Sequence, residues 1–504
     1  MNSHFSENST VHRPWIILTV MLVAILEVLD STIVNVALPN MKASFSVNND
    51  QITWVLTSYI VASAVMIPLT GLLSSRLGKR KFMQITITGF MVSSFLCGIT
   101  QGIHQMIVLR VLQGLSGASL IPLSQSIMRE VFSKQEQPKA MAIWGLGVMT
   151  APVMGPTIGG YIVSWSTWRW IFYINMPICL LSLLLCYFFI PQSKTQKRPI
   201  DMFSLIYMVL GIGCLQLFLD QGQSRSWFDS YLICFLLGLS VIGLLAFIYR
   251  TFQKKLTPLV KLQLLSYRNF SLCSLMLLCF CGCIFATLAI QPIMLSSLFG
   301  YPADATGLIM APRGLASGFA MALSPLMLRW ISPRAQIALG LILCAIGAFL
   351  MSQWSLQANT WSLVTPGLWQ GLGMGFFMIP VSTMALNDLP SSETTEGAGL
   401  FSYSRMLGTS IGISLLSTYI SRQGQKHWHH LSQFITPYST HLQSFLAPLH
   451  LAPHTPQAMN QISQVVMQQS TFQAYINAYQ LIAILLMIII PFSFLIQQPL
   501  EKSP

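Results

Sequence analysis

Charged side chains are scarce in this sequence. Asp, Glu, Lys and Arg make up 8% of the 504 residues, against about 25% in soluble domains. Hydrophobic residues make up 53%, and the mean hydropathy is +0.63. These values exclude an ordinary soluble domain and indicate a polytopic membrane protein. A leader cleavage site is also missing after the first apolar run, residues 14–38, so we interpret this run as a retained first span.

Acidic residues are rare inside the apolar segments, and cysteines are missing from the predicted external loops. Of the 14 acidic residues, only Glu27 and Asp30 lie well inside an apolar segment. The ten cysteines all fall in or near predicted spans, and none lies in a predicted external loop where an oxidising compartment could pair it. We therefore expect packing cysteines and no disulfide framework.

The apolar segments predict fourteen transmembrane helices of about 20 residues each. They lie near 14–38, 51–73, 82–101, 104–127, 139–164, 169–190, 202–220, 230–249, 269–298, 305–328, 335–353, 361–386, 397–420 and 472–497. The arrangement is six spans, then two, then six. A basic linker, 191–201, follows the first six spans, and a second linker, 250–268, follows the added pair in 202–249.

The distribution of basic residues predicts the orientation. With the N-terminus inside, 19 of the 27 Lys and Arg residues fall in cytoplasmic segments and five in external loops or at span edges, as the positive-inside rule requires. Residues 1–13 and 499–504 are then cytoplasmic termini, and 14–190 and 269–498 are two six-helix bundles. The net charge of +13 therefore reflects topology and contact with anionic lipid, and we expect no nucleic-acid partner.

The second bundle contains the one long external loop, residues 421–471. It holds six of the nine histidines: His427, His429, His430, His441, His450 and His454. The spacing permits metal binding, but no carboxylate, cysteine or regular ligand pattern accompanies it. We expect no metal site here and interpret the segment as a solvated or partner-contacting loop.

The two acids of the first span point to proton chemistry. Glu27 and Asp30 are three residues apart, so they share a helix face. Two neighbouring carboxyls in a low dielectric resist double ionisation, and a span carboxyl that binds and releases a proton is what proton coupling requires. Arg110, in the fourth span, is their natural electrostatic neighbour. A structural ion pair with Arg110 is the alternative, and we rank Asp30 ahead of Glu27.

Two further span arginines and a glycine-rich helix complete the candidates. Arg313 and Arg405 need internal partners or a water-filled cavity, or anchor to backbone carbonyls. The fifth span carries small residues at every fourth position, together with two prolines, which favours close helix approach and bending; packing alone is the simpler alternative. The residues of this pattern are Gly147, Ala151, Pro152, Gly155, Pro156, Gly159 and Gly160.

These motifs together resemble the drug:proton antiporters of the major facilitator superfamily, in the fourteen-span branch typified by EmrB and QacA. "LDSTIVNVALP" (29–39) is similar to the branch's first-span signature, and "RVLQGLSGA" to its proton-linked motif through Arg110 and Gln113. The fifth-span pattern resembles the antiporter motif. The loop between spans two and three resembles the family's loop motif at Gly71, Arg76, Gly78, Lys79 and Arg80. Ser75 stands where that motif usually has an acid, and Glu27 is not part of the signature.

The resemblance implies two six-helix bundles around a central cavity, with alternating access. It implies proton-coupled multidrug efflux of lipophilic compounds across the inner membrane, driven by the proton gradient without another cofactor. Asn35, Gln113, Arg313 and Arg405 are the cavity candidates. EmrB-like proteins also imply a periplasmic membrane-fusion adaptor and an outer-membrane channel, for which the long loop is a plausible docking surface.

Other functions fit the residues less well. A dedicated proton-coupled exporter of a metabolite or siderophore would use the same fold, and nothing in the sequence excludes it. A membrane enzyme would need acids or histidines clustered at one membrane face, for which the external histidines are the only candidates. A nutrient importer is disfavoured by the complete fifth-span motif. We therefore predict a secondary active transporter and no enzyme.

Overall fold

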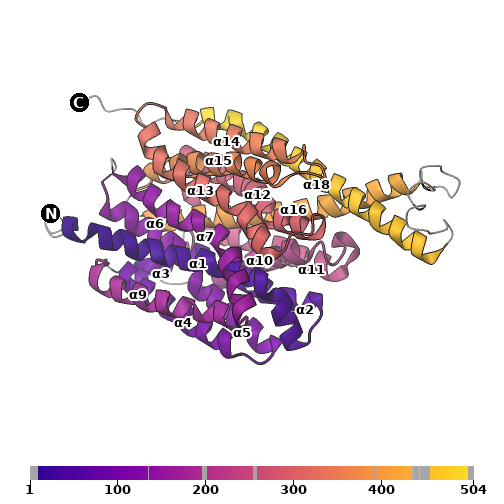
Figure 1. The fold of residues 1–504 in the computed structure, drawn as a ribbon. Helices are drawn as coiled ribbons and strands as arrows, with labels where there is room; N and C mark the ends of the chain where they lie inside the picture. The colour runs from indigo at the N-terminus through magenta and orange to yellow at the C-terminus, as the bar shows by residue number, and fades with distance from the viewer. Residues whose placement is uncertain are drawn as a thin grey trace.

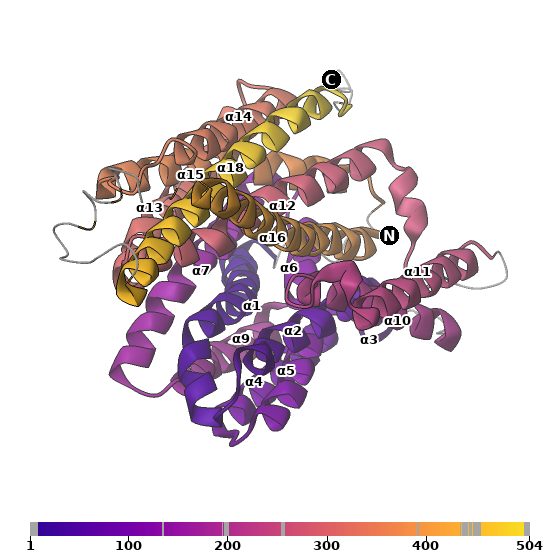
Figure 2. The same ribbon diagram turned by 90° about the vertical axis from the view of Figure 1, so that its right-hand side faces the viewer.

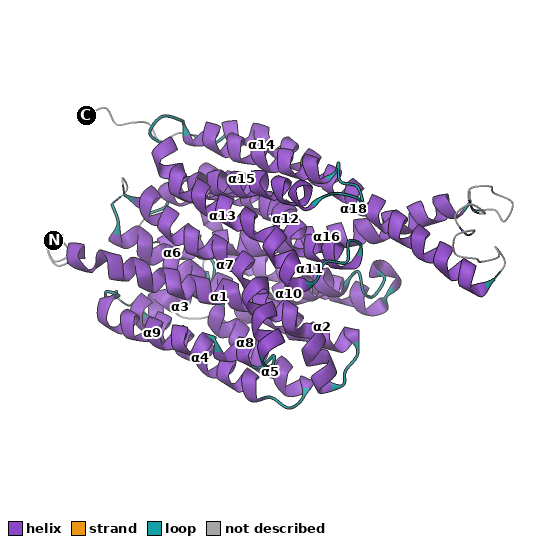
Figure 3. Ribbon diagram, viewed as in Figure 1, coloured by secondary structure: helices purple, strands orange, loops and turns teal. Residues whose placement is uncertain are grey.

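The computed structural model describes residues 9–133, 136–193, 195, 201–253, 258–390, 393–433, 435, 442, 446 and 455–497. Over these residues the protein is helical and contains no strand (Figure 3). The α-helices are α1 (Ser9–Phe45), α2 (Asn49–Met66), α3 (Thr70–Leu77), α4 (Lys79–Ile99), α5 (Ile103–Gly117), α6 (Leu120–Val131), α7 (Gln137–Trp165), α8 (Trp170–Tyr173), α9 (Asn175–Phe189), α10 (Met202–Gln221), α11 (Tyr231–Thr251), α12 (Arg268–Ser297), α13 (Ala303–Met327), α14 (Pro333–Met351), α15 (Thr360–Asn387), α16 (Thr394–Ser432) and α18 (Pro456–Phe494).

Ten stretches of the described helices are long and apolar enough to cross a membrane. They are α1, α2 with α3, α4, α5 with α6, α8 with α9, α10, α11, α12, α14 and α18. Four further long helices, α7, α13, α15 and α16, interrupt their apolar sequences with glycine, proline or polar residues. The protein is thus an all-helical, multi-pass membrane protein, and ten of the fourteen predicted spans meet the length and hydropathy expected of a span.

The helices form two groups that follow the order of the chain (Figure 1). In the first, α1 packs against α7 and α9, and α2 packs against α5. In the second, α15 packs against α13 and α14, and α12 packs against α16. The groups meet where α7 lies along α13 and where α16 contacts α3 and α6. The helices α7, α13 and α16 therefore form much of the boundary between the two halves.

The two inserted helices form a hairpin beside both halves (Figure 2). Glycines let α10 and α11 approach closely, because a Cβ on Gly243 would lie only 2.8 Å from the backbone nitrogen of Gly211. α10 then contacts α2 in the first half and α16 in the second. Gln216 on α10 donates to the hydroxyl of Ser410 on α16 at 2.8 Å.

The structure departs from the predicted external loop. α16 continues past the predicted span end to Ser432, and α18 begins at Pro456, so both ends of the segment 421–471 are helical. Figure 1 shows these two helices projecting together beyond the rest of the molecule. The polar sequence of the segment suggested an irregular loop, but it has no proline within the first residues next to either span. Between the helices, only residues 433, 435, 442, 446 and 455 are described, so His441, His450 and His454 lie outside the described residues.

Candidate transport site

The acid of the opening motif lies in a network buried inside the first half. Asp30 on α1 accepts a hydrogen bond from Nη1 of Arg110 at 2.7 Å. Its other oxygen accepts from Gln113 at 3.0 Å and from Asn175 at 2.8 Å. All four side chains are fully buried, with 0% exposure. One carboxylate and one guanidinium thus face each other across α1 and α5 without contact with solvent.

Several groups hold the Arg110 guanidinium in position. Nε donates to the carbonyl of Val55 at 3.1 Å, and Nη1 also donates to Gln113 at 2.7 Å. The guanidinium lies 4.2 Å from the centre of the Tyr59 ring, a cation–π contact that strengthens when water is excluded. Nη2 has no protein hydrogen-bond partner among the described residues. The arginine is therefore oriented toward Asp30 from three sides.

The Asp30–Arg110 ion pair is energetically sensitive because both side chains are buried. A charge inside a membrane protein is costly, and removing one member of a buried pair leaves the other uncompensated at about 3–5 kcal/mol. Protonation of Asp30 would remove its negative charge in the same way. The network is therefore an arrangement in which gain or loss of one proton changes the balance of forces on Arg110.

Glu27 faces a different environment one turn earlier on α1. It is 9% exposed, and its Oε2 has no hydrogen-bond partner among the described residues. The Arg405 guanidinium, on α16 of the second half, acts on it electrostatically, as does Asp30. Glu27 therefore links Asp30 electrostatically to the opposite half.

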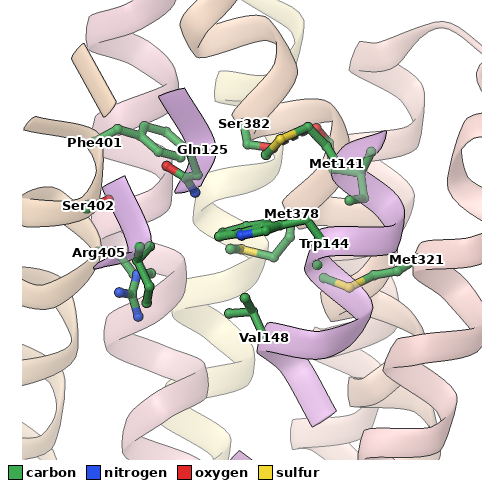
Figure 4. Close-up of a pocket in the computed structure, with 13 residues that line it drawn as sticks. Gln125, Met141, Trp144, Val148, Met321, Met378, Ser382, Phe401, Ser402 and Arg405 are labelled. Carbon is green, nitrogen blue, oxygen red and sulfur yellow. Dashed lines mark hydrogen bonds between the residues drawn. The ribbon is translucent and has the colours of Figure 1, made fainter. Parts of the chain in front are cut away.

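Arg405 also lines a small cavity between the two halves (Figure 4). α6 and α7 form one wall, and α13, α15 and α16 form the other. The space amounts to about 20 Å³, room for about one water molecule. Its lining is Ile121, Gln125, Met141, Trp144, Gly145, Val148, Met321, Met378, Ile379, Ser382, Phe401, Ser402 and Arg405. Sulfur-containing and aromatic side chains thus surround a few polar groups.

The structure separates the four predicted cavity residues. Arg405 lines the cavity between the halves. Gln113 belongs to the Asp30 network, and Arg313 is buried in the second half, where it donates to Gln291. Asn35 is exposed on α1. Arg405 is therefore the one of the four that lines this cavity, and sequence spacing alone could not distinguish it from Arg313.

The glycine pattern of α7 packs against α1. A Cβ on Gly147 would lie 2.6 Å from Cγ of Met21, and one on Gly155 would lie 2.1 Å from Oγ1 of Thr32. A Cβ on Gly159 would meet Ile33 at 2.8 Å. A larger side chain at any of these positions would require α1 or its side chains to shift.

The rest of the α7 pattern is described in part. Ala151 is buried and Pro152 is half-buried, whereas the side chain of Pro156 lies outside the described residues. A Cβ on Gly160 would have ordinary contact with Val36 at 4.0 Å. On the opposite face of α7, a Cβ on Gly145 would lie 3.1 Å from the sulfur of Met321 on α13. α7 therefore lies between α1 and the second half.

The loop motif between α3 and α4 is held by partners that lie elsewhere in the chain. Lys79 donates to Oε1 of Glu130 on α6, and the two form an ion pair at 2.5 Å. Gly78 has φ = +81°, a conformation that favours glycine. Arg80 donates to the carbonyl of Tyr187 and lies over its ring, whereas Arg76 is exposed.

The same end of the molecule is closed between the halves. A Cβ on Gly71 would lie 2.4 Å from Cγ of Glu396 on α16. The hydroxyls of Ser126 and Thr395 are 2.5 Å apart. Lys261 pairs with Glu396 at 3.1 Å. Where the family motif usually has an acid, Ser75 bonds the carbonyl of Leu72 in its own helix, so the closure uses other residues.

Several residues of these sites were not predicted from the sequence. Asn175 begins α9, far along the chain from Asp30, and Glu130 lies beyond the predicted fourth span, which ends near residue 127. Trp144 lies in the predicted fifth span and Gln125 in the predicted fourth, and spacing alone did not distinguish either as a cavity residue. Polarity inside an apolar span was the available signal for Gln125, but that signal could not identify a partner. Among the described residues, no group of three or more His, Cys, Asp or Glu side chains could hold a metal ion.

The two helical halves, the α7 boundary and the buried acid–arginine pair are features expected of a membrane transporter. The chain belongs to the Major Facilitator Superfamily, which matches residues 20–413. The bacterial homologue of the lysosomal transporter Spinster, in an inward-facing structure, shares this fold at a TM-score of 0.58 and 15% identity, over 96% of each chain. The human organic anion transporter MFSD10 gives a TM-score of 0.59 at 14% identity, covering 94% of this chain and 99% of the other.

Curated relatives are similar along nearly the whole sequence. The multidrug export protein EmrB of Haemophilus influenzae is 34% identical, over 91% of this chain and 90% of its own length. The fatty acid resistance protein FarB of Neisseria gonorrhoeae is 32% identical, over 97% of both chains. EmrB of Escherichia coli K12 is 32% identical, over 90% of this chain and 89% of its own. The chain is therefore a member of the superfamily with EmrB-like and FarB-like efflux relatives.

Proposed function

We propose that this protein is a proton-coupled antiporter that exports lipophilic compounds. This proposal rests on the fully buried ion pair between Asp30 and Arg110. A purely structural role would be served equally well by apolar packing, since buried pairs seldom add net stability. A carboxyl group that alternates between a charged and a neutral form would explain why the chain keeps an ion pair at this position.

The proposed mechanism follows from the contacts of Asp30. With Asp30 charged, Arg110, Gln113 and Asn175 all donate to it. Proton binding to one carboxyl oxygen removes the charge and turns that oxygen into a donor, so the ion pair with Arg110 is lost. α1 carries Asp30 and packs against α7, which in turn lies along α13. Movement at the acid therefore has a direct route to the boundary between the halves.

The energy available is sufficient for export. A charge that crosses a potential of 100 mV gains about 2.3 kcal/mol, and a tenfold concentration gradient costs about 1.4 kcal/mol. One proton per neutral substrate would therefore support useful efflux. Glu27, which Asp30 and Arg405 both influence, is the second proton-binding candidate in this scheme.

The cavity beside Arg405 is the proposed substrate region. Methionine and aromatic walls suit varied lipophilic ligands. At about 20 Å³ the space is far smaller than the roughly 300–1,000 Å³ of ligand pockets. The halves must therefore separate before substrate binds. A relative named for fatty acid resistance and others named for multidrug export support lipophilic substrates. The competing proposal, a dedicated exporter of a metabolite or siderophore, would use the same cavity.

We further propose fourteen spans, with α7, α13, α15 and α16 crossing the inner membrane alongside the ten apolar stretches. Of these helices, α7 packs against α1, α15 against α14 and α16 against α12, and α13 packs against α7 and α15. The basic residues favour cytoplasmic termini. The end at which Gly71 meets Glu396 and Ser126 meets Thr395 would then be cytoplasmic. The projecting ends of α16 and α18 would lie in the periplasm. There they offer a docking surface for a membrane-fusion adaptor and, through it, an outer-membrane channel.

Efflux from cells tests the transport function without assuming the proton. Cells that lack their own drug pumps would express the wild type, Arg405→Gln, or Arg329→Gln as a control at an exposed site outside the cavity. We expect the wild type and the control to lower accumulation of a lipophilic dye, and Arg405→Gln to change the range of compounds exported. Unchanged accumulation with every lipophilic compound, at normal membrane expression, would contradict the proposed function.

A further inference from the structure

The second half of the protein holds a buried arginine with no counterpart of Asp30. Arg313, on α13, is 2% exposed. Its Nη2 donates to Oε1 of Gln291 on α12. Its Nε and Nη1 have no protein hydrogen-bond partner among the described residues. Arg110 in the first half, in contrast, forms an ion pair with Asp30 at 2.7 Å.

More unpartnered polar groups lie on the helices that enclose Arg313. Gln370 on α15 is 0% exposed, and neither atom of its amide has a partner among the described residues. The hydroxyl of Ser317, one turn after Arg313, is 1% exposed and likewise unpartnered. Arg313 and Ser317 on α13 and Gln370 on α15 thus present several buried hydrogen-bond donors.

Glycines bring these two helices together at this level. A Cβ on Gly367 would lie 3.7 Å from Nε of Arg313, and one on Gly371 only 2.2 Å from its carbonyl oxygen. Gln370 lies between these glycines in the sequence of α15. Its side chain points toward α14, where a Cβ on Gly347 would lie 2.5 Å from Cγ of Gln370. Cys344, one turn away on α14, acts electrostatically on Arg313, so Gln370 and Arg313 approach the same stretch of α14.

The remaining groups near Arg313 do not neutralise it. The titratable side chains that act on it electrostatically are Tyr479 on α18 and Cys344 on α14, and both are neutral in their ordinary forms. Gln291 contributes only a dipole. None of the ion pairs among the described side chains includes Arg313. A guanidinium buried without a counter-charge is expensive, and each buried donor without an acceptor adds to that cost.

We propose that the Arg313–Gln370–Ser317 cluster binds a small monovalent anion within the second half. The cluster offers guanidinium, amide and hydroxyl donors and has no carboxylate to repel a negative charge. Such an anion would neutralise Arg313 as Asp30 neutralises Arg110. A free halide and the carboxylate head of a lipophilic acid share this chemistry. The site is separate from the cavity beside Arg405, so the inference stands apart from the proposed export function.

Thermal unfolding of the purified full chain in detergent tests the site. The midpoint would be measured in sodium isethionate, whose anion is large, and again with chloride or octanoate replacing it at equal ionic strength. We expect chloride, octanoate or both to raise the midpoint of the wild type by about 1–3 °C, as binding to the folded state alone requires. Chloride alone would identify a free halide, and octanoate alone a carboxylate head group. If both stabilise the wild type and compete, either source occupies the same site.

Variants assign the effect to this cluster. Arg313→Gln removes the charge and should abolish the stabilisation. Arg329→Gln makes the same change at an exposed position on the segment that follows α13 and should retain it. Should Arg313→Gln fail to fold, Gln370→Leu keeps the charge but removes donors, and it should raise the anion concentration needed for half of the effect several-fold.

Three results would overturn the proposal. The first is a wild-type midpoint that is indifferent to both anions at equal ionic strength. The second is stabilisation that persists undiminished in Arg313→Gln. The third is an unchanged half-effect concentration in Gln370→Leu. Each would mean that Arg313 is a structural residue held by its contacts with the protein alone.

Discussion

Replacing Asp30 with asparagine is the most informative change to the buried network. Asparagine keeps the size of the side chain, and its oxygen still accepts a hydrogen bond, but the negative charge opposite Arg110 is lost. Because both residues are 0% exposed, water cannot compensate. A broken buried pair costs about 3–5 kcal/mol, a large share of the roughly 5–15 kcal/mol that stabilises a folded protein.

A second change distinguishes loss of the pair from loss of packing. Arg110→Gln in the Asp30→Asn background removes the uncompensated guanidinium, leaving neutral side chains that can hydrogen-bond one another. The double variant should therefore be more stable than the sum of the two single changes predicts. For residues in direct contact such interaction energies are about 0.5–3 kcal/mol, and we expect a value near the upper end.

Unfolding by denaturing detergent in mixed micelles would measure these free energies for the wild type, both single variants and the double variant. Asp229→Asn, which changes an exposed acid outside both bundles, is the matched control and should leave stability unchanged. Additive effects of the two single changes would refute our reasoning, since they would mean that Asp30 and Arg110 do not interact in the folded protein. A stable Asp30→Asn variant would likewise show that water reaches the pair.

Two other predictions follow from the contacts around α7 and at the closed end. Gly155→Ala places a methyl group 2.1 Å from Oγ1 of Thr32 and should lower the free energy of unfolding by about 1–3 kcal/mol. Gly238→Ala is the control, because nothing lies within 4 Å of the added methyl group, and it should leave stability unchanged. Equal unfolding curves for the two variants would contradict the close packing of α1 and α7. Ser126→Cys combined with Thr395→Cys, in a chain freed of its native cysteines, should form a disulfide on oxidation that blocks transport until it is reduced, because the native hydroxyls are 2.5 Å apart. Failure to cross-link on a denaturing gel would mean that the halves do not meet at this point.

The sequence predicted best what apolar patterning controls. Long apolar runs identified the helices, and the predicted span at 269–298 is a single helix, α12. The small residues of the fifth span indicated a closely approached face, and the structure places α1 against it. These features depend on local sequence and on the membrane, so neighbours far along the chain were not needed to predict them.

The sequence did not identify most contacts between residues that lie far apart along the chain. Arg110 was expected near the first-span acids, but nothing in the chain indicated Asn175 as a further partner of Asp30. Arg313 and Arg405 looked alike as span arginines, yet one is enclosed by its own bundle and the other faces a cavity. The helical ends of α16 and α18 were also missed, because a polar segment outside the membrane resembles a loop unless its neighbours are known.

Proton movement is the most direct test of the central claim. Inverted vesicles that contain the wild type, Asp30→Asn or the control Asp229→Asn would be energised, and proton release from the vesicle lumen would be followed when a lipophilic substrate is added. We predict substrate-dependent release with the wild type and the control, and none with Asp30→Asn at equal protein content. Normal release with Asp30→Asn would contradict the account, because the coupling proton would then bind elsewhere, with Glu27 the next residue to test.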